Sequence, residues 1–188
     1  MSRAKIMILA GGTGGHVIPG LTIAKALEDA KCDITWIGTK GGIEEKLVPK
    51  ANIKIEYITV MGLRGKSLMN VLIAVKQLIQ SIFQSINLLM KYRPDVVIGM
   101  GGYVSGPGGI AAFLLRYPLV IHEQNSVPGT TNKFLARIAS SVLEAFPGSF
   151  KSKMNAKTIG NPIREEIALI EDPKKRLQDR NFPIRILV

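Results

Sequence analysis

Cysteine and acidic side chains are scarce in this sequence of 188 residues. Cys32 is the only cysteine, so no disulfide can form within the chain. The first residues lead directly into a predicted strand and lack the long apolar core of a signal peptide. Both features favour a reducing, cytoplasmic setting. With 14 Asp and Glu against 25 Lys and Arg, the net charge of +11 predicts an anionic partner: nucleic acid, nucleotide, pyrophosphate or an acidic membrane surface.

Low-complexity tracts and internal repeats are also lacking, while 46% of the residues are hydrophobic. This composition excludes a disordered chain and favours a globular fold. We predict one domain over residues 1–165. The charged stretch 171–181 is typical of a linker, and FPIRILV at 182–188 is typical of a buried strand. Residues 166–188 are therefore predicted to hold the linker and first strand of a truncated second domain.

Short β-branched runs alternate along the chain with longer helical patterns, and glycine or proline separates them. Predicted strands cover residues 5–10, 33–38, 54–59, 95–99, 118–123, 141–146 and 156–160. Predicted helices cover residues 17–30, 67–91, 107–116, 129–139 and 162–170. Several strands are apolar on both faces, which is typical of strands covered by helices on each side. The pattern predicts an α/β fold with a Rossmann-like, doubly wound parallel sheet.

The first strand-to-helix turn, GGTGGH at residues 11–16, begins with four glycines in five residues. Glycines at such a turn let backbone amides approach an anion at a helix amino terminus. A dinucleotide fingerprint would need a third glycine where Val17 stands, and no acidic residue follows the second strand to hold a ribose. No G-K-[ST] closes the turn either. A nicotinamide enzyme and a P-loop enzyme are both disfavoured, and we expect no cofactor.

Two further turns carry residues suited to ligand binding. GMGGYVSGPGG at residues 99–109 follows the fourth predicted strand, and HEQNSVPGTTNK at 122–133 follows the fifth. Ligands of doubly wound sheets bind at the carboxyl ends of the strands, where these turns are predicted to lie. The glycine-rich turns at 11–16 and 99–109 suit a ligand with more than one phosphate. The turn at 122–133 supplies polar side chains.

The segments GGTGGHVIPG, GMGGYVSGPGG, HEQNSVPGTTNK and GNPIREEI together resemble the MurG family of peptidoglycan glycosyltransferases. The resemblance implies the amino-terminal, acceptor-binding half of a two-domain GT-B glycosyltransferase, with the donor-binding domain beginning in residues 166–188. The full enzyme would transfer N-acetylglucosamine, with inversion, from UDP-N-acetylglucosamine to the C4 hydroxyl of the N-acetylmuramoyl unit of lipid I. The product would be lipid II, an intermediate of peptidoglycan synthesis. The chain alone is expected to be inactive.

The resemblance also implies which residues contact the two substrates. Donor contacts are implied for Thr13, Gly14, Gly15, Asn125 and Arg164. Acceptor contacts are implied for Gly101, Gly102, Tyr103, Ser105, His122, Gln124 and Asn132. The two glycine-rich turns would hold the pyrophosphate of the lipid-linked acceptor. The expected partners are UDP-N-acetylglucosamine, lipid I and an anionic membrane surface, and no nucleic acid.

Displacement at the sugar's anomeric carbon requires a base for the acceptor hydroxyl. His16 is the first candidate because it stands in the first turn of a predicted helix, where the helix dipole favours a neutral imidazole. Glu123 is the second candidate, since a carboxylate at a strand end can accept a proton directly or orient a histidine. Asp, Glu and His nowhere show metal-ligand spacing, so we expect no metal.

The predicted helix 67–91 carries a broad apolar stripe, which we expect to be core. Its members are Leu72, Val75, Leu78, Ile79, Ile82, Phe83, Ile86, Leu89 and Met90. Met69, Ile73 and Leu88 fall on the opposite side, near lysines that include Lys76. The helix is too polar to span a bilayer, but apolar residues ringed by lysines suit an anionic membrane surface. Because the implied acceptor carries a polyprenyl lipid, we expect peripheral docking at the cytoplasmic face of the bacterial plasma membrane. The alternative is a helix whose apolar residues are all buried.

A second function, from a different class, stays open. Intact acceptor motifs do not by themselves require catalysis. The alternative is a non-catalytic, membrane-associated fragment that binds the lipid-linked acceptor pyrophosphate without turning it over. The observation that would best distinguish the two functions is whether the natural reading frame continues past Val188 into a second glycine-rich pattern of a strand followed by G-G-S.

Overall fold

A parallel sheet forms the centre of the computed structural model, which describes residues 3–60 and 68–176. Its strands are β1 (Lys5–Ala10), β2 (Asp33–Gly38), β3 (Lys54–Tyr57), β4 (Val96–Gly101), β5 (Leu119–Glu123), β6 (Ser141–Glu144) and β7 (Lys157–Thr158). Their order is β3-β2-β1-β4-β5-β6-β7, and every neighbouring pair is parallel. The winding direction reverses between β1 and β4, which confirms the predicted doubly wound α/β fold. The strand predicted at 182–188 lies outside the described residues.

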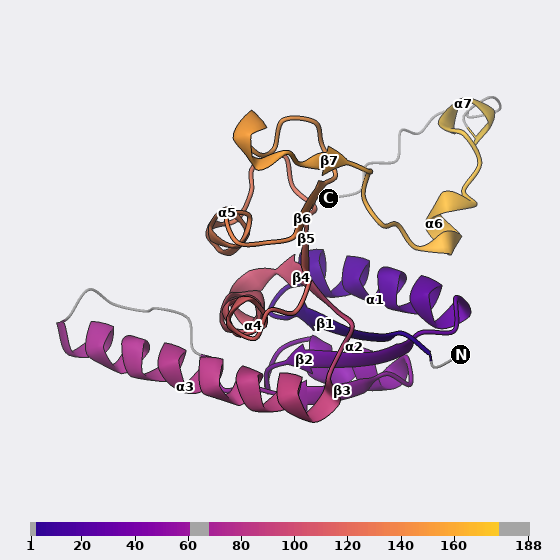
Figure 1. Ribbon diagram of the computed structural model, residues 1–188. Helices are drawn as coiled ribbons and strands as arrows, with labels where there is room; N and C mark the ends of the chain where they lie inside the picture. Colours follow the sequence, from indigo (N-terminus) through magenta and orange to yellow (C-terminus); the bar gives the residue numbers. More distant parts are fainter. Residues whose placement is uncertain (1–2, 61–67, 177–188) are drawn as a thin grey trace.

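Helices lie on both sides of the sheet, and two short helices follow its last described strand (Figure 1). They are α1 (Gly14–Asp29), α2 (Glu44–Lys50), α3 (Leu68–Tyr92), α4 (Gly102–Leu114), α5 (Thr130–Leu135), α6 (Glu165–Ala168) and α7 (Pro173–Arg176), with a 3₁₀ helix, η1, at Ser152–Met154. The sequence pattern does not predict α2, because its 7 residues are too few for a clear helical period. The short helix α7 falls within the stretch predicted as a linker, whose last residues, 177–181, are not described.

Two helices begin earlier than predicted, α1 at Gly14 rather than residue 17 and α4 at Gly102 rather than residue 107. The dense glycines predict a loop because glycine destabilises helix interiors. At the junction of β4 and α4, however, Gly101 and Gly102 have positive φ values of 103° and 77°. Glycine adopts these values without steric cost, so the strand turns into the helix with no loop between them. Residues 102–109 are therefore helical rather than a free glycine-rich loop.

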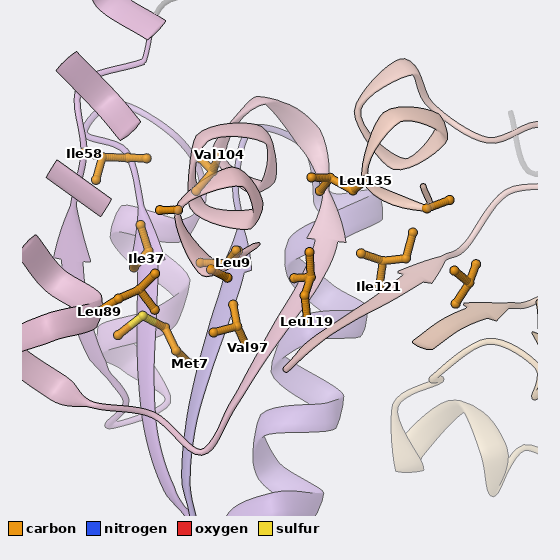
Figure 2. Packing of buried hydrophobic residues seen from close by; sticks show 14 of the residues in the cluster. Met7, Leu9, Ile37, Ile58, Leu89, Val97, Val104, Leu119, Ile121 and Leu135 are labelled. Atoms are coloured by element: carbon orange, nitrogen blue, oxygen red, sulfur yellow. The ribbon is translucent and has the colours of Figure 1, made fainter. Parts of the chain in front are cut away.

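Alternation along the strands divides the core into two layers, one on each face of the sheet. Leu9 of β1 packs in the layer that includes Leu89 of α3 and Val104 of α4 (Figure 2). Ile8 points the other way, into the layer formed with Trp36 and with residues of α1 and α2. Burial of both faces explains why the predicted strands are apolar throughout.

The long helix α3 exposes much of the stripe that its sequence predicts as core. Its buried positions are Ser81, Ser85 and Leu89, spaced four residues apart. The stripe members Val75, Leu78, Ile79, Phe83 and Met90 are between 43% and 62% exposed. Periodicity locates the apolar side of a helix, but here two of the three buried positions are small serines, so most of the larger stripe side chains remain exposed. Figure 1 shows the amino-terminal half of α3 extending beyond the sheet.

The predicted membrane-contact residues of α3 have different outcomes. Ile73 is 48% exposed and Lys76 is exposed, as predicted. The prediction for Leu88 is wrong, because this side chain is half-buried and packs against the core layer beside Leu89. The side chain of Met69 lies outside the described part of the structure. None of the described helices is both long enough and apolar enough to cross a membrane.

Candidate active site

Two glycine-rich junctions meet at the switch point of the sheet, at the carboxyl ends of β1 and β4. A Cβ atom added to Gly102 would lie 2.5 Å from the carbonyl oxygen of Gly11. A Cβ atom added to Gly101 would lie 3.0 Å from the His16 ring. Glycine permits these approaches, which explains why both junctions are rich in it. His16 therefore lies between the first turn of α1 and the start of α4.

The first turn of α1 presents backbone amides next to His16. Thr13 is the exposed N-cap residue, and its side chain makes no capping hydrogen bond. The N–H groups of Gly14 and Gly15 have no acceptor among the described residues. Unpaired amides at a helix amino terminus bind anions. Thr13, Gly14 and Gly15 thus form a turn beside His16 that is suited to an anion.

Glu44, which is not among the residues predicted from the sequence, stabilises the first glycine-rich turn by hydrogen bonds. Its carboxylate is fully buried and accepts hydrogen bonds from the N–H groups of Gly12 (3.1 Å) and Thr39 (3.0 Å) and from the Thr39 hydroxyl (2.9 Å). The Gly12 amide therefore points at Glu44 and not at a ligand. The glycines near Glu44 are the sequence feature that could have pointed to it, since a Cβ atom at Gly38 or Gly42 would come within 2.7 Å of Glu44.

Glu123, predicted as the alternative base, has a structural role instead. It is fully buried, and its Oε1 accepts hydrogen bonds from the backbone N–H (3.0 Å) and the side-chain amide (2.9 Å) of Asn125. Its Oε2 accepts from the N–H of Gly129 (3.1 Å) and the side-chain amide of Asn132 (2.9 Å). Four donors occupy this carboxylate, so it neither faces a substrate hydroxyl nor orients a histidine by hydrogen bonding. Glu144, at the end of β6, gathers loop amides in the same way.

His16, Gln124 and His122 form a hydrogen-bonded chain that ends at Gly160. His16 Nδ1 lies 3.1 Å from Gln124 Oε1, Gln124 Nε2 lies 3.0 Å from His122 Nδ1, and His122 Nε2 lies 3.0 Å from the Gly160 oxygen. Burial lowers the pKa of His122, although the hydrogen bond to Gly160 and the charge of Glu123 oppose that shift. The lowered pKa favours the neutral imidazole of His122. The structure brings these three predicted residues together and adds Gly160, which the sequence analysis did not select.

The predicted acceptor residues Tyr103 and Ser105 differ in their access to a ligand. Tyr103 is 39% exposed, and its hydroxyl lies 3.3 Å from the Thr39 hydroxyl. Ser105 is fully buried, with its hydroxyl 2.8 Å from the carbonyl oxygens of both Leu9 and Gly101. Burial leaves Ser105 without access to a ligand, so it secures the junction of β4 and α4 instead of touching the acceptor.

Asn132 is 1% exposed and joins the third turn to the strand before it. Its amide nitrogen donates to the carbonyl oxygen of His122 (3.1 Å) and to Glu123 (2.9 Å). Its Oδ1 is the one buried side-chain nitrogen or oxygen without a partner in the described part of the chain. Such an atom is costly to bury unpaired, which makes Asn132 Oδ1 a candidate acceptor for a bound group.

The remaining predicted donor contacts, Asn125 and Arg164, are exposed. Asn125 follows β5, and its carbonyl oxygen accepts a hydrogen bond from the Ser149 hydroxyl at 3.1 Å. Arg164 is the N-cap residue of α6, which is linked to α1 by an exposed ion pair of Lys25 and Glu165 (3.8 Å). Within the described residues, no hydrogen bond or ion pair joins the Arg164 side chain to the other predicted site residues.

A hollow of about 490 Å³ beside the third turn has a cationic rim. Its lining includes the apolar residues Val127, Pro128, Phe150 and Met154 and the cations Lys133, Arg137, Lys151 and Lys153. No described carboxylate lies within ion-pair distance of these four cations. The hollow is therefore suited to an anionic ligand.

Another hollow, of about 270 Å³, includes Lys5 and Asp33 and lies at the opposite, amino ends of β1 and β2. No group of three or more His, Cys, Asp or Glu side chains in the described ranges is placed to hold a metal ion.

The doubly wound sheet, with its glycine junctions at the switch point, is the amino-terminal domain of the GT-B glycosyltransferase class. More particularly, the chain belongs to glycosyltransferase family 28, because residues 6–144 match the N-terminal domain of that family. The crystal structure of MurG from Acinetobacter baumannii superposes with a TM-score of 0.75 and 40% sequence identity, over 86% of this chain and 47% of that one. The predicted resemblance to the MurG family is confirmed.

Curated relatives agree with this assignment. A protein of Vibrio cholerae serotype O1 (strain M66-2) is 52% identical over 184 residues, and one of Proteus mirabilis (strain HI4320) is 48% identical over 186 residues. Both are named UDP-N-acetylglucosamine–N-acetylmuramyl-(pentapeptide) pyrophosphoryl-undecaprenol N-acetylglucosamine transferase. The matches cover 98% and 99% of this chain but 51% of each relative, so the chain spans about half the length of the relatives that it matches.

Proposed function

We propose that this chain is the acceptor-binding half of an inverting N-acetylglucosaminyltransferase. The whole protein would transfer the sugar from UDP-N-acetylglucosamine to the C4 hydroxyl of the N-acetylmuramoyl unit of lipid I, forming lipid II. The observation that carries the proposal is the meeting of two glycine junctions around His16 at the switch point. The names of the relatives, which specify this sugar and a pyrophosphoryl-undecaprenol acceptor, support it.

Each part of the site has a task in this reaction. The free amides of Gly14 and Gly15 and the amino-terminal end of α4 bind the acceptor's pyrophosphate. His16 takes the proton of the C4 hydroxyl while the hydroxyl oxygen bonds to the anomeric carbon of the donor sugar. The bond between that carbon and UDP breaks, and UDP leaves with the electron pair. Asn125 and Arg164 belong to the donor side of the same cleft.

The exposed apolar side of α3 supports peripheral docking at an anionic membrane, where a polyprenyl-linked acceptor resides. We define the α3 apolar face as the exposed stripe residues Val75, Leu78, Ile79, Phe83 and Met90. Lys76 is exposed on the same helix, and the whole chain has a net charge of +11. Apolar side chains combined with positive charge favour binding to anionic lipids.

The cationic hollow beside the third turn supports an acceptor with negative charge beyond its sugar. Its rim cations Lys133 and Arg137 belong to or directly follow α5, next to the Asn125 turn. An acceptor that carries a pyrophosphate and a peptide offers several anionic groups. Long-range attraction by unpaired cations would bring such a ligand to the site.

A transfer assay tests the proposed function. The full-length protein, given UDP-N-acetylglucosamine with a labelled sugar and lipid I, should form labelled lipid II. The chain of 188 residues, given the same substrates, should show no turnover, because catalysis requires both substrates to be held together. Turnover by this chain alone would contradict its assignment as the acceptor half. Failure of the full-length protein to transfer the sugar would leave the non-catalytic, acceptor-binding function as the better account.

Vesicle binding tests the membrane role. The chain should bind vesicles of anionic phospholipid more strongly than neutral vesicles, and added salt should weaken the binding. Replacing Ile79 and Phe83 by serine should weaken the binding to anionic vesicles, because it removes apolar side chains from the α3 apolar face. Replacing the exposed, uncharged Gln80 of the same helix by serine is the matched control. Equal binding to both kinds of vesicle by the unaltered chain, or binding to neither, would contradict docking through the α3 apolar face.

A further inference from the structure

The hydrogen-bonded chain from His16 to Gly160 ends on a group whose role is fixed. A backbone carbonyl oxygen only accepts, so His122 Nε2, 3.0 Å from the Gly160 oxygen, must carry a hydrogen and donate it. Because His122 is neutral, its other ring nitrogen, Nδ1, holds a lone pair and only accepts. The hydrogen bond of 3.0 Å between His122 Nδ1 and Gln124 must therefore be donated by Gln124.

A second carbonyl group fixes the orientation of the Gln124 amide independently. Gln124 Nε2 lies 3.0 Å from the carbonyl oxygen of His122 as well as 3.0 Å from its Nδ1, and both of these atoms are acceptors. The amide nitrogen must face His122, because the reverse orientation would place the amide oxygen against two acceptors. The amide oxygen then faces His16, so His16 Nδ1, 3.1 Å away, must be the donor.

We propose that Gln124 is a positioning residue that fixes His16 in the tautomer with its hydrogen on Nδ1, which leaves the lone pair of Nε2 for the substrate's proton. This inference rests on the base role of His16 in the proposed function and names the residue that prepares His16 for it. When Nε2 takes up a proton, Nδ1 still donates to Gln124, so the hydrogen-bonded chain needs no rearrangement. A free histidine side chain prefers its hydrogen on Nε2, so this tautomer needs an acceptor at Nδ1.

The surroundings of His16 leave Nε2 accessible. Asn132 Oδ1 is the only buried side-chain nitrogen or oxygen without a partner in the described part of the chain. His16 Nε2 has no partner there either, so it is not buried. The glycine backbone of α4's first turn limits the ring on one side, because Cβ atoms on Gly101 and Gly102 would lie 3.0 Å and 3.4 Å from it. Gln124 is itself 5% exposed, so water does not compete for its amide.

The tautomer can be measured directly, because His16 and His122 are the only 2 histidines of the sequence. Long-range proton–nitrogen correlation spectra of the chain distinguish a ring nitrogen that carries hydrogen from one that does not. At a pH where both rings are neutral, His16 should carry hydrogen on Nδ1 and His122 on Nε2. Opposite tautomers in the two rings are the expected result. A His16 ring with its hydrogen on Nε2 would overturn the proposal without any variant being needed.

A variant tests whether Gln124 causes this state. Gln124→Met keeps the size of the side chain but removes both its donor and its acceptor. His16 should shift to the Nε2–H tautomer, while His122 keeps its hydrogen on Nε2 because Gly160 still accepts it. Gln80→Met is the matched control, since Gln80 is exposed on α3. An unchanged His16 tautomer in a folded Gln124→Met chain would also overturn the proposal.

Kinetics of the full-length protein separate positioning from simple support of the fold. Gln124→Met should lower kcat roughly 10- to 100-fold and leave KM for UDP-N-acetylglucosamine nearly unchanged, because the base is present in the wrong tautomer. A loss confined to KM, with the predicted tautomers observed, would assign Gln124 to substrate binding and contradict positioning. The spectra require no turnover, so a failed transferase assay would overturn the proposed function while the tautomer assignment is judged separately.

Discussion

The carboxyl edge of the sheet and the exposed side of α3 differ in which side chains they bury. At the sheet edge, polar side chains are buried: Glu123 is 0% exposed and His122 is 1% exposed. On α3, apolar side chains face solvent: Phe83 is 62% exposed and Ile79 is 50% exposed. Both regions reverse the usual distribution of residues between surface and core. Each reversal therefore needs its own physical explanation.

Buried polar side chains and exposed apolar side chains are stabilised in different ways. A buried carboxylate or imidazole is tolerated only when its hydrogen bonds are satisfied, and Glu123 meets this condition with four donors. The satisfied groups in turn fix the backbone of the turns that surround His16. Hydrogen bonds within the fold cannot compensate for exposed apolar side chains. A contiguous exposed apolar surface marks an interaction site. The Glu123 carboxylate is thus satisfied within the fold, while the α3 apolar face is not covered by any described residue.

The largest expected effect is that of replacing His16 in the full-length protein. His16→Ala should lower kcat roughly 10²- to 10⁴-fold, the usual contribution of a general base, and change KM for UDP-N-acetylglucosamine little. Steady-state kinetics at saturating lipid I measure both quantities, with Glu28→Ala on the exposed side of α1 as the control. If kcat is kept and only acceptor affinity is lost, His16 binds substrate and does not act as the base.

Replacing Glu123 tests whether the buried polar edge is structural. Glu123→Ala leaves several turn donors unpaired, so we expect a loss of about 2–4 kcal/mol in the free energy of unfolding. Glu123→Gln should be destabilising too, because its amide nitrogen would face donors. Urea unfolding of the chain measures both losses. Stability close to that of the unaltered chain in Glu123→Gln would contradict the structural role and restore Glu123 as a candidate for catalysis.

A pair of substitutions on one helix sharpens the contrast on α3. Leu89→Ala, at a fully buried position, should cost about 2–4 kcal/mol of unfolding free energy through lost burial and the cavity that remains. Phe83→Ala, six residues before it but exposed, should change that free energy by less than about 0.5 kcal/mol. Similar losses at the two positions would show that Phe83 is core in solution and that the α3 apolar face is not free.

The smallest expected effect is a pH dependence of stability caused by His122. Burial lowers the pKa of His122 in the folded chain, so the unfolded chain takes up a proton first as the pH falls. Its contribution to stability is present above the ordinary histidine pKa of about 6.5 and is lost as the pH falls towards the lowered folded pKa. Between about pH 7.5 and about pH 5.5, the unaltered chain should lose more stability than His122→Gln. Parallel unfolding curves across this range would contradict a lowered pKa of His122 in the folded chain.

Sequence reasoning predicts the strands and the sheet because their residues are apolar on both faces and their ends carry turn residues. It errs where glycine can indicate either a loop or a sharp junction between a strand and a helix. Gly101 and Gly102 are predicted to lie in a loop, yet their positive φ values let β4 pass directly into α4. It errs again on α3, where the period locates an apolar stripe but cannot show that Ser81 and Ser85 make the buried contact.

The position of His16 in the first helical turn and the family resemblance, which implies His122 and Gln124, also select these three residues from the sequence. Sequence reasoning cannot assign their roles. Whether a carboxylate acts as a base or accepts four turn amides depends on contacts across the fold, which is why the role of Glu123 is predicted wrongly. Glu44 escapes notice for the same reason, since its partner Gly12 is 32 positions away in the sequence.

The central claim is that the sheet edge binds the acceptor's pyrophosphate beside His16. Titration of the chain with a water-soluble N-acetylmuramyl pyrophosphate that carries a short alkyl group tests it most directly, with amide and imidazole nitrogen signals as the readout. We predict that Gly14, Gly15, Gly102 and His16 Nε2 shift together and saturate, while residues around Lys5 and Asp33 at the opposite edge of the sheet do not. Saturating shifts that leave the first turns of α1 and α4 unchanged would contradict the account.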